Sequence, residues 1–211
     1  MSELKISIEN KIKGIYDIIL MTKEFQKFSK HFHTFASKEE SYLLLKSPHS
    51  KALQFLGHSL YRNTIIEIAK LFSNNKGDRY SIKNLLNTLN NNHKQLSLDI
   101  TVLIPPLEFI NNNQELLGNI KLLRDKIYAH SDKPNTSLEE LEVSLNDIDY
   151  LIDFCERTLN SIYISISNND FSFLSPITGS KDLNLLSLLV EGESQRLNKI
   201  KEEILSKYSQ H

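Results

Sequence analysis

The amino-acid sequence predicts an all-α fold: a helical bundle of long core helices with an appended C-terminal helix. Three observations support this prediction. The 211 residues include only 6 Gly and 5 Pro, so few positions favour tight turns. Leu occurs 33 times and Ile 23 times against 3 Val, and together with abundant Lys and Glu this composition indicates long helices. Apolar residues also recur every three or four positions along most of the chain, as they do on one face of a helix.

The composition also limits the class of protein. We expect a single domain over residues 1–211. Lys and Arg total 25 and Asp and Glu total 26, and this net charge of −1 excludes a polybasic protein that coats nucleic acid with its whole surface. The single Cys155 excludes a disulfide framework, and neither of the Gly-rich phosphate-binding motifs occurs.

The sequence carries no sign of a membrane or metal protein. Residues 1–14 are rich in charges, unlike a signal peptide, and no apolar run approaches the ~18 residues that a membrane span needs. We therefore expect a cytoplasmic protein. No set of Cys, His, Asp and Glu stands at metal-ligand spacing, so we expect no metal or cofactor.

Two long helices are predicted in the first third of the chain. The first covers about 3–35, and residues 36–50 form a short break in which Ser47 and Pro48 give a helix start signal. The second covers about 50–73 and is apolar nearly all round, so we expect it to be central in the bundle. The buried stripe of the first helix is marked by Ile8, Ile12, Ile15, Tyr16 and Ile19.

Shorter elements are predicted next. A turn over 73–78 precedes a helix that Ser81 caps and that ends near Asn90–Asn92. Pro105 and Pro106 break the following stretch, and another helix begins at about 107 or 114 and ends near residue 130.

The last third of the chain predicts two more long helices. Ser137 and Glu140 form a capping box that opens a helix over about 138–166, whose apolar positions follow a heptad pattern. This seam has two interpretations: the core of one chain, or a contact between two subunits. Cys155 lies on it, so we expect a buried, inert thiol. A loop over 168–182 leads to a final amphipathic helix at about 183–208.

The segment Leu122–Asp132 carries the most informative chemistry. The apolar face of its helix continues in register to His130, so a titratable imidazole lies on a stripe that faces a core or an interface. Arg124 precedes it with five residues between them. From spacing alone the favoured interpretation is a histidine that satisfies a helix end and an arginine that forms a surface ion pair, because an isolated Arg and His are common.

The exact string resembles a known family. An Arg, a polar residue, a short spacer and a His near a helix end form the motif of the HEPN superfamily, here Arg124, Asp125 and His130. The phrase LRDKIYAHSD and the upstream stretch Tyr61–Leu86 are similar to the abortive-infection branch of that superfamily. The resemblance covers about residues 40–167.

This resemblance implies a helical bundle that forms a homodimer, with the Arg and His of both subunits in one cleft. Many such proteins are metal-independent endoribonucleases of phage defence or toxin–antitoxin systems, which leave a 2′,3′-cyclic phosphate. His130 then serves as base or acid, and Arg124 binds the phosphoryl oxygens. Asp125 is expected to orient Arg124 or His130. A toxin subgroup has a Tyr that a partner enzyme modifies, and Asp132 stands at that position, so we do not expect this regulation.

Further residues are expected to support this site. Lys121, Lys126 and Lys133 make the segment locally positive and are candidates for RNA binding. Asn63 and Glu67 interrupt an apolar stripe on the 50–73 helix, where buried polar groups need partners, and Glu67 is a candidate partner of Arg124.

Two other functional readings remain open at the level of sequence. One is a non-catalytic helical dimer that binds RNA, a nucleotide or a partner protein, such as an antitoxin or a subunit of a defence complex. The other is a structural adaptor that uses the heptad seam and the C-terminal helix.

Overall fold

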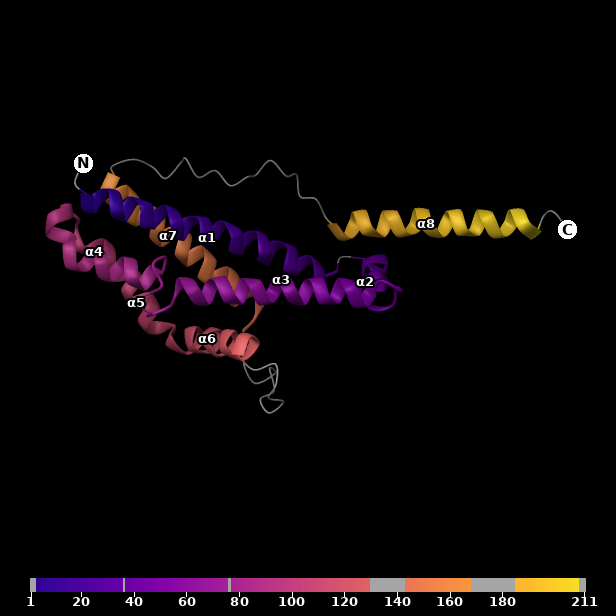
Figure 1. Cartoon of the computed structure of the whole chain (residues 1–211), viewed down its shortest axis with the longest axis horizontal. Helices are drawn as coiled ribbons and strands as arrows, with labels where there is room; N and C mark the ends of the chain where they lie inside the picture. Colours follow the sequence, from indigo (N-terminus) through magenta and orange to yellow (C-terminus); the bar gives the residue numbers. More distant parts are fainter. Residues whose placement is uncertain (1–2, 36, 76, 130–142, 168–184, 209–211) are drawn as a thin grey trace. The chain divides into compact units, whose positions relative to one another are not determined.

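A computed structural model describes residues 3–35, 37–75, 77–129, 143–167 and 185–208, and among these no residue forms a strand. The all-α prediction is confirmed. No helix within the described ranges is long and apolar enough to cross a membrane. The elements in chain order (Figure 1) are α1 (Glu3–His33), α2 (Lys38–Leu45), α3 (Ser50–Leu71), α4 (Ile82–Leu96), the 3-10 helix η1 (Ile100–Leu103), α5 (Ile104–Asn112), α6 (Gln114–Ala129), α7 (Leu145–Ser167) and α8 (Leu185–Tyr208).

The chain groups into two compact units. The larger holds Met1–Gln26 and Leu60–Pro176, and the smaller holds Lys27–Ser59 and Ile177–His211. Helices α1 and α3 each contribute residues to both units. The expected single domain over 1–211 stays a prediction.

Helices α1 and α7 run antiparallel in the core of the larger unit (Figure 1). Lys5 Nζ donates to the carbonyl of Ile166 at 2.8 Å, whereas Gln26 Nε2, near the other end of this pairing, donates to the carbonyl of Leu145 at 2.9 Å. Between them, Lys23 and Glu156 form an ion pair of 2.7 Å. The heptad residues that are buried in this core are Ile148, Ile152, Cys155, Leu159, Ile162 and Ile166.

This burial decides between the two interpretations of the heptad seam. Side chains that the chain's own core covers are not free to contact a second subunit. From Ile148 to Ile166 the seam is therefore part of the core of one chain, and the interpretation as a subunit contact is wrong for this part. Leu138 and Leu141 lie outside the described residues.

The start of α7 differs from the predicted start. Val143 and Ser144 are not helical, so a continuous helix over 138–166 is wrong. The helix begins at Leu145 because Ser144 and Asp147 form the capping box: the Ser144 N–H donates to Asp147 Oδ2 at 2.8 Å, and the Asp147 N–H donates to Ser144 Oγ at 3.1 Å. Ser137 and Glu140 lie outside the described residues.

The expected break over 36–50 contains the short helix α2. Ser37 is its N-cap and accepts a hydrogen bond from the Glu40 N–H at 3.1 Å. The start signal at Ser47 is real, since its hydroxyl accepts from the His49 N–H at 3.2 Å just before α3 begins.

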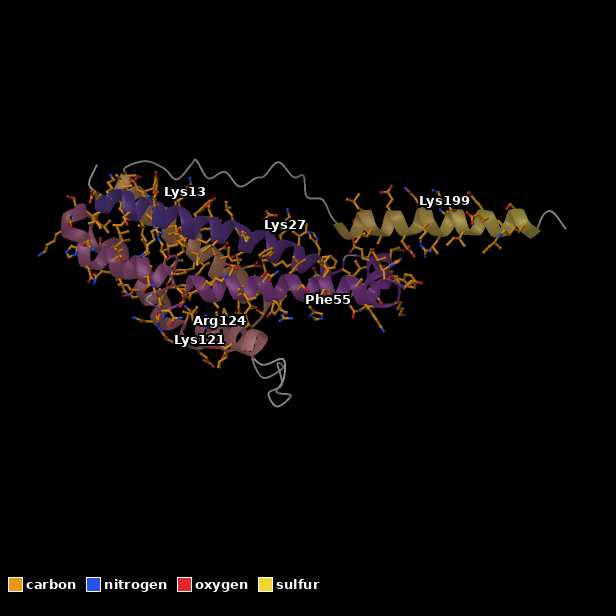
Figure 2. The ribbon with its side chains drawn as sticks, viewed as in Figure 1. Lys13, Lys27, Phe55, Lys121, Arg124 and Lys199 are labelled. Carbon is orange, nitrogen blue, oxygen red and sulfur yellow. The ribbon has the colours of Figure 1, made fainter. Side chains whose placement is uncertain are left out.

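Helix α3 is buried over only part of its length. Its second part contributes Ile65, Ile68 and Leu71 to the core of the larger unit. Its first part leaves Phe55 73% exposed (Figure 2), so the expectation that this apolar helix is central in the bundle is wrong there. Within the described residues of the smaller unit, this first part of α3 buries the side that carries Gly57. The backbone of Gly57 lies against Phe32 of α1.

The elements from α4 to α6 also differ at their ends from the prediction. Asn90–Asn92 do not end α4, because Asn92 Nδ2 bonds to the Thr88 carbonyl at 2.7 Å and the helix continues to a left-handed C-cap at Ser97. Pro105 and Pro106 lie in the first turn of α5, where proline is tolerated, and so they begin a helix rather than break one.

Candidate functional site

In the larger unit, α6 forms one wall of a cavity of about 250 Å³. Other walls come from the end of α3, the turn that follows it, and the first turn of α4. The cavity therefore joins segments that are about fifty residues apart in the sequence. Its lining residues are Ala69, Phe72, Ser73, Asn74, Asn75, Lys83, Gln114, Leu117, Gly118, Ile120, Lys121 and Arg124.

Arg124 lies on the cavity wall and is held by its neighbour in the sequence. Its Nε and Nη2 donate to Asp125 Oδ1 at 2.9 and 2.7 Å, and its side chain is 22% exposed. The pair fixes the plane of the guanidinium and leaves the Nη1 donors for another acceptor. Lys121 lies one turn earlier on the same helix (Figure 2).

The cavity is electrically positive. Three cations line it, and no carboxylate is among the lining residues. Burial lowers the pKa of Lys83, and the positive charge of Lys121 lowers it further. Lys83 is also the second residue of α4, whose first turn holds no acidic residue, so it lies at the positive end of the helix dipole. Such a cavity favours an anion.

Two expected supporting residues lie elsewhere. Glu67 accepts from Lys70 Nζ at 2.7 Å, so it pairs along its own helix instead of with Arg124. Lys70 competes effectively because it is one turn away on the same face. Asn63 is exposed, so it is not the buried polar group that the apolar stripe suggested. Within the described structure, neither residue forms a hydrogen bond or an ion pair with Arg124.

The other candidates are only partly described. The backbone of Lys126 belongs to α6, but its side chain is not described. His130 and Lys133 lie outside the described residues. The roles expected of all three stay predictions.

A comparison with protein families decides where the chain belongs. Residues 9–183 match the family model HEPN_AbiU2, described as AbiU2, over most of the chain. The chain is a member of the HEPN AbiU2 family. The resemblance to the abortive-infection branch is thus confirmed, and the match begins well before residue 40, where the similarity was expected to start. No curated protein and no solved structure matches the chain.

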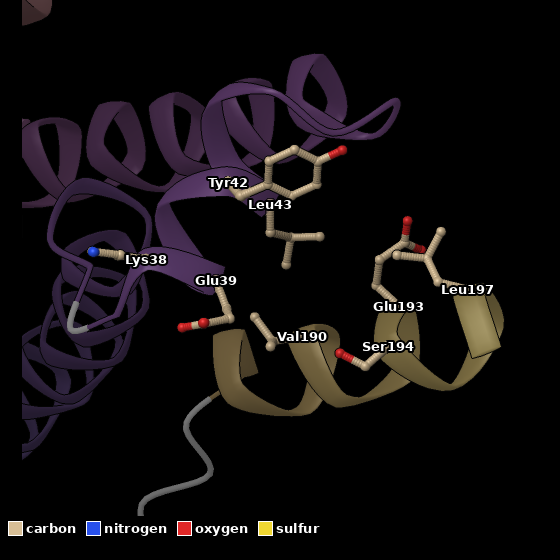
Figure 3. Close-up of a pocket in the computed structure, with 8 residues that line it drawn as sticks. All are labelled: Lys38, Glu39, Tyr42, Leu43, Val190, Glu193, Ser194 and Leu197. Carbon is tan, nitrogen blue, oxygen red and sulfur yellow. The ribbon is translucent and has the colours of Figure 1, made fainter.

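This HEPN AbiU2 chain has a second cavity, in its smaller unit, with a different character. It measures about 260 Å³ and lies between α2 and α8 (Figure 3). Tyr42, Leu43 and Val190 give it an apolar wall, and the carboxylates of Glu39 and Glu193 border it. Lys38 also lines this cavity and Glu193 pairs with Arg196, so it lacks the excess of cations found in the cavity on α6. The cavity on α6 is therefore the better candidate for a nucleic-acid site in a HEPN protein.

Sequence reasoning missed Lys83 and the turn over Ser73–Asn75. One local signal for Lys83 exists: a lysine in the first turn of a Ser-capped helix is unfavourable next to the helix dipole. A residue in such a position suggests an anionic ligand. The Ser73–Asn75 turn shows no comparable signal, because only the fold of the HEPN AbiU2 chain brings it to α6.

Proposed function

We propose that this HEPN AbiU2 chain is a metal-independent endoribonuclease that acts in abortive infection, as a toxin or phage-defence effector. The observation that carries the proposal is the position of Arg124. Asp125 holds its guanidinium on the wall of a cavity that three cations line. Arginine in this setting suits a phosphodiester, whose charge increases as a nucleophile attacks the phosphorus.

The proposed reaction uses the hydroxyl that RNA carries beside each phosphate. A base removes the proton from the 2′-hydroxyl, and the oxygen forms a bond to phosphorus while the bond from phosphorus to the 5′-oxygen breaks. An acid gives a proton to that leaving oxygen. The products are a 2′,3′-cyclic phosphate and a 5′-hydroxyl.

We assign these proton transfers to His130, because imidazole titrates near neutral pH and serves as base or acid. Arg124 stabilises the charge on the phosphoryl oxygens. Lys121, Lys126 and Lys133 add attraction for the RNA backbone.

The active form in this proposal is a homodimer in which both subunits contribute Arg124 and His130 to one cleft. Light scattering should then give a mass of about twice the 24.4 kDa of the chain. A strictly monomeric protein that retains full nuclease activity would contradict the shared cleft.

Purified protein with single-stranded RNA and EDTA tests the reaction. The wild type should produce fragments with cyclic-phosphate ends, and Arg124→Ala and His130→Ala should each slow cleavage at least a hundredfold. Lys13→Ala is the matched control: Lys13 is exposed on α1 in the same unit and does not line the cavity. Equal cleavage by wild type and both site variants would overturn the assignment.

The same experiment distinguishes the non-catalytic alternative from the nuclease. A protein that binds RNA through Arg124 and never cleaves it, with or without added divalent metal, would be a binding module of a defence complex. Induced expression in bacteria adds a second readout: the nuclease should stop growth, and the Arg124→Ala variant should not.

A further inference from the structure

The cavity on α6 is large enough for part of a ligand. Its volume of about 250 Å³ is many times the space that a single water molecule needs. Phe72, Leu117 and Ile120 contribute apolar wall, whereas the Ser73–Asn75 turn contributes polar groups. A phosphate with part of its sugar fits such a space, and a folded partner domain does not.

The cavity holds positive charge that the chain does not neutralise. Among the described residues, Lys83 and Lys121 form no ion pair, although the structure places them close enough for their charges to interact. Lys83 is also half-buried, so its charged form loses hydration. An anion in the cavity would offset the repulsion between the two lysines and the lost hydration of Lys83.

Arg124 connects this cavity to the proposed reaction. It lines the cavity, and in the proposed reaction it binds the scissile phosphate. A single strand with one phosphate at Arg124 carries its next phosphate one nucleotide away. Lys83 and Lys121 are the cations available to that neighbouring phosphate on the cavity side of Arg124.

We propose that Lys83 and Lys121, with the cavity between α4 and α6, form a subsite for a backbone phosphate of RNA next to the scissile one. Lys83 is a new binding residue in this assignment, and it comes from a helix outside the Arg–His motif. The inference rests on the proposed function, because that function supplies the RNA strand.

The test measures binding with an RNA that cannot be cleaved. A short 2′-O-methylated oligonucleotide lacks the attacking hydroxyl, so its affinity reports binding alone. Lys83→Ala should weaken binding about five- to twentyfold and make the slope of log K against log salt shallower by about 0.7, the value for one lost phosphate contact on a single strand. Lys83→Arg should retain most of the affinity, and Lys13→Ala should change it less than twofold.

A second variant closes the cavity without altering its charge. Gly118 shares one face of α6 with Gln114 and Lys121, all of which line the cavity, and a Cβ atom there meets no other atom within 4 Å. Gly118→Leu therefore places a side chain toward the cavity and also improves helix propensity. Weaker binding by this variant, with an unchanged melting temperature or a higher one, would support a site inside the cavity.

The outcomes separate this inference from the proposed function. RNA cleavage that depends on Arg124 and His130 but not on Lys83 would overturn the subsite alone. Binding of the methylated RNA that depends on Lys83, with no cleavage of ordinary RNA, would overturn the nuclease and keep the subsite. A competition arm with adenosine monophosphate identifies the source of the phosphate: displacement of the RNA at micromolar concentration would replace the RNA subsite by a nucleotide site.

Discussion

Asp125 is the residue whose role the geometry defines most closely. Both of its hydrogen bonds to Arg124 end on one carboxylate oxygen, so it orients the guanidinium and at the same time brings a negative charge near the phosphate site. The first effect favours catalysis, whereas the second opposes RNA binding. Substitution of Asp125 should therefore lower the rate of cleavage without lowering RNA affinity.

We predict that Asp125→Ala lowers kcat about ten- to a hundredfold and leaves RNA affinity equal or slightly higher. A small misplacement of the Arg124 guanidinium should reduce the rate by this factor, whereas loss of the Asp125 carboxylate removes its repulsion of the RNA phosphate. Single-turnover cleavage and binding to methylated RNA measure the two effects. Glu67→Ala is the matched control, because Glu67 pairs with Lys70. A parallel loss of affinity would show that Asp125 only maintains the fold.

Cys155 gives a second prediction at this scale. It is fully buried on α7, and burial raises the pKa of its thiol well above the ordinary value, with the Glu156 carboxylate adding to the shift. Because the thiolate is the reactive form, a disulfide reagent should label the native protein only as fast as the core opens, and the denatured protein at once. Rapid labelling of the native chain would contradict this burial.

At the scale of the element, Gly57 decides how closely α3 approaches α1 in the smaller unit. A Cβ atom there would lie 2.6 Å from the Cβ of Phe32, and that atom cannot move without the α1 backbone. Gly57→Ala should lower the free energy of unfolding by about 1–2 kcal/mol, because overpacking exceeds the gain in helix propensity.

The matched control for this prediction is Gly192→Ala on α8, where a Cβ atom meets nothing within 4 Å. This change should raise the free energy of unfolding by up to about 1 kcal/mol. Denaturant unfolding followed by circular dichroism compares the two variants. Equal effects of the same sign would show that the contact with Phe32 does not limit the approach of the helices.

The elements also show what the sequence could and could not predict. Long stripes such as that of α1 were predictable, because only one face of such a helix is apolar. The length of α4 was not, since the side chain of Asn92, in a run of residues that is typical of a helix end, bonds back to the helix instead. Arg124 and Asp125 are neighbours in the sequence, so their pair was predictable. Lys83 was not, because only tertiary packing brings α4 to α6.

At the scale of the whole molecule, the net charge of −1 indicates that the proposed RNA binding depends on a local group of cations and not on the whole surface. The three cations of one cavity contribute about −2 to the slope of log K against log salt, from ~0.7 per phosphate on a single strand, and contacts by Lys126 and Lys133 would bring the slope to about −3.5. Titrations of methylated RNA over a range of salt concentrations measure this slope. A slope steeper than about −5 would point to a broad basic surface instead of a local site.

The pairing of α1 with α7 also determines when this protein can fold during synthesis. The bond between Lys5 and Ile166 spans 161 positions, so α1 is synthesised well before α7, the helix with which it pairs. At ~5–20 residues per second, this interval is roughly 10–30 s. Helix α6, which carries Arg124, is synthesised before α7, so the core that α7 completes does not yet exist at that point. A nascent chain that lacks α7 therefore has an incomplete core, and the proposed nuclease activity should begin only after α7 has been synthesised.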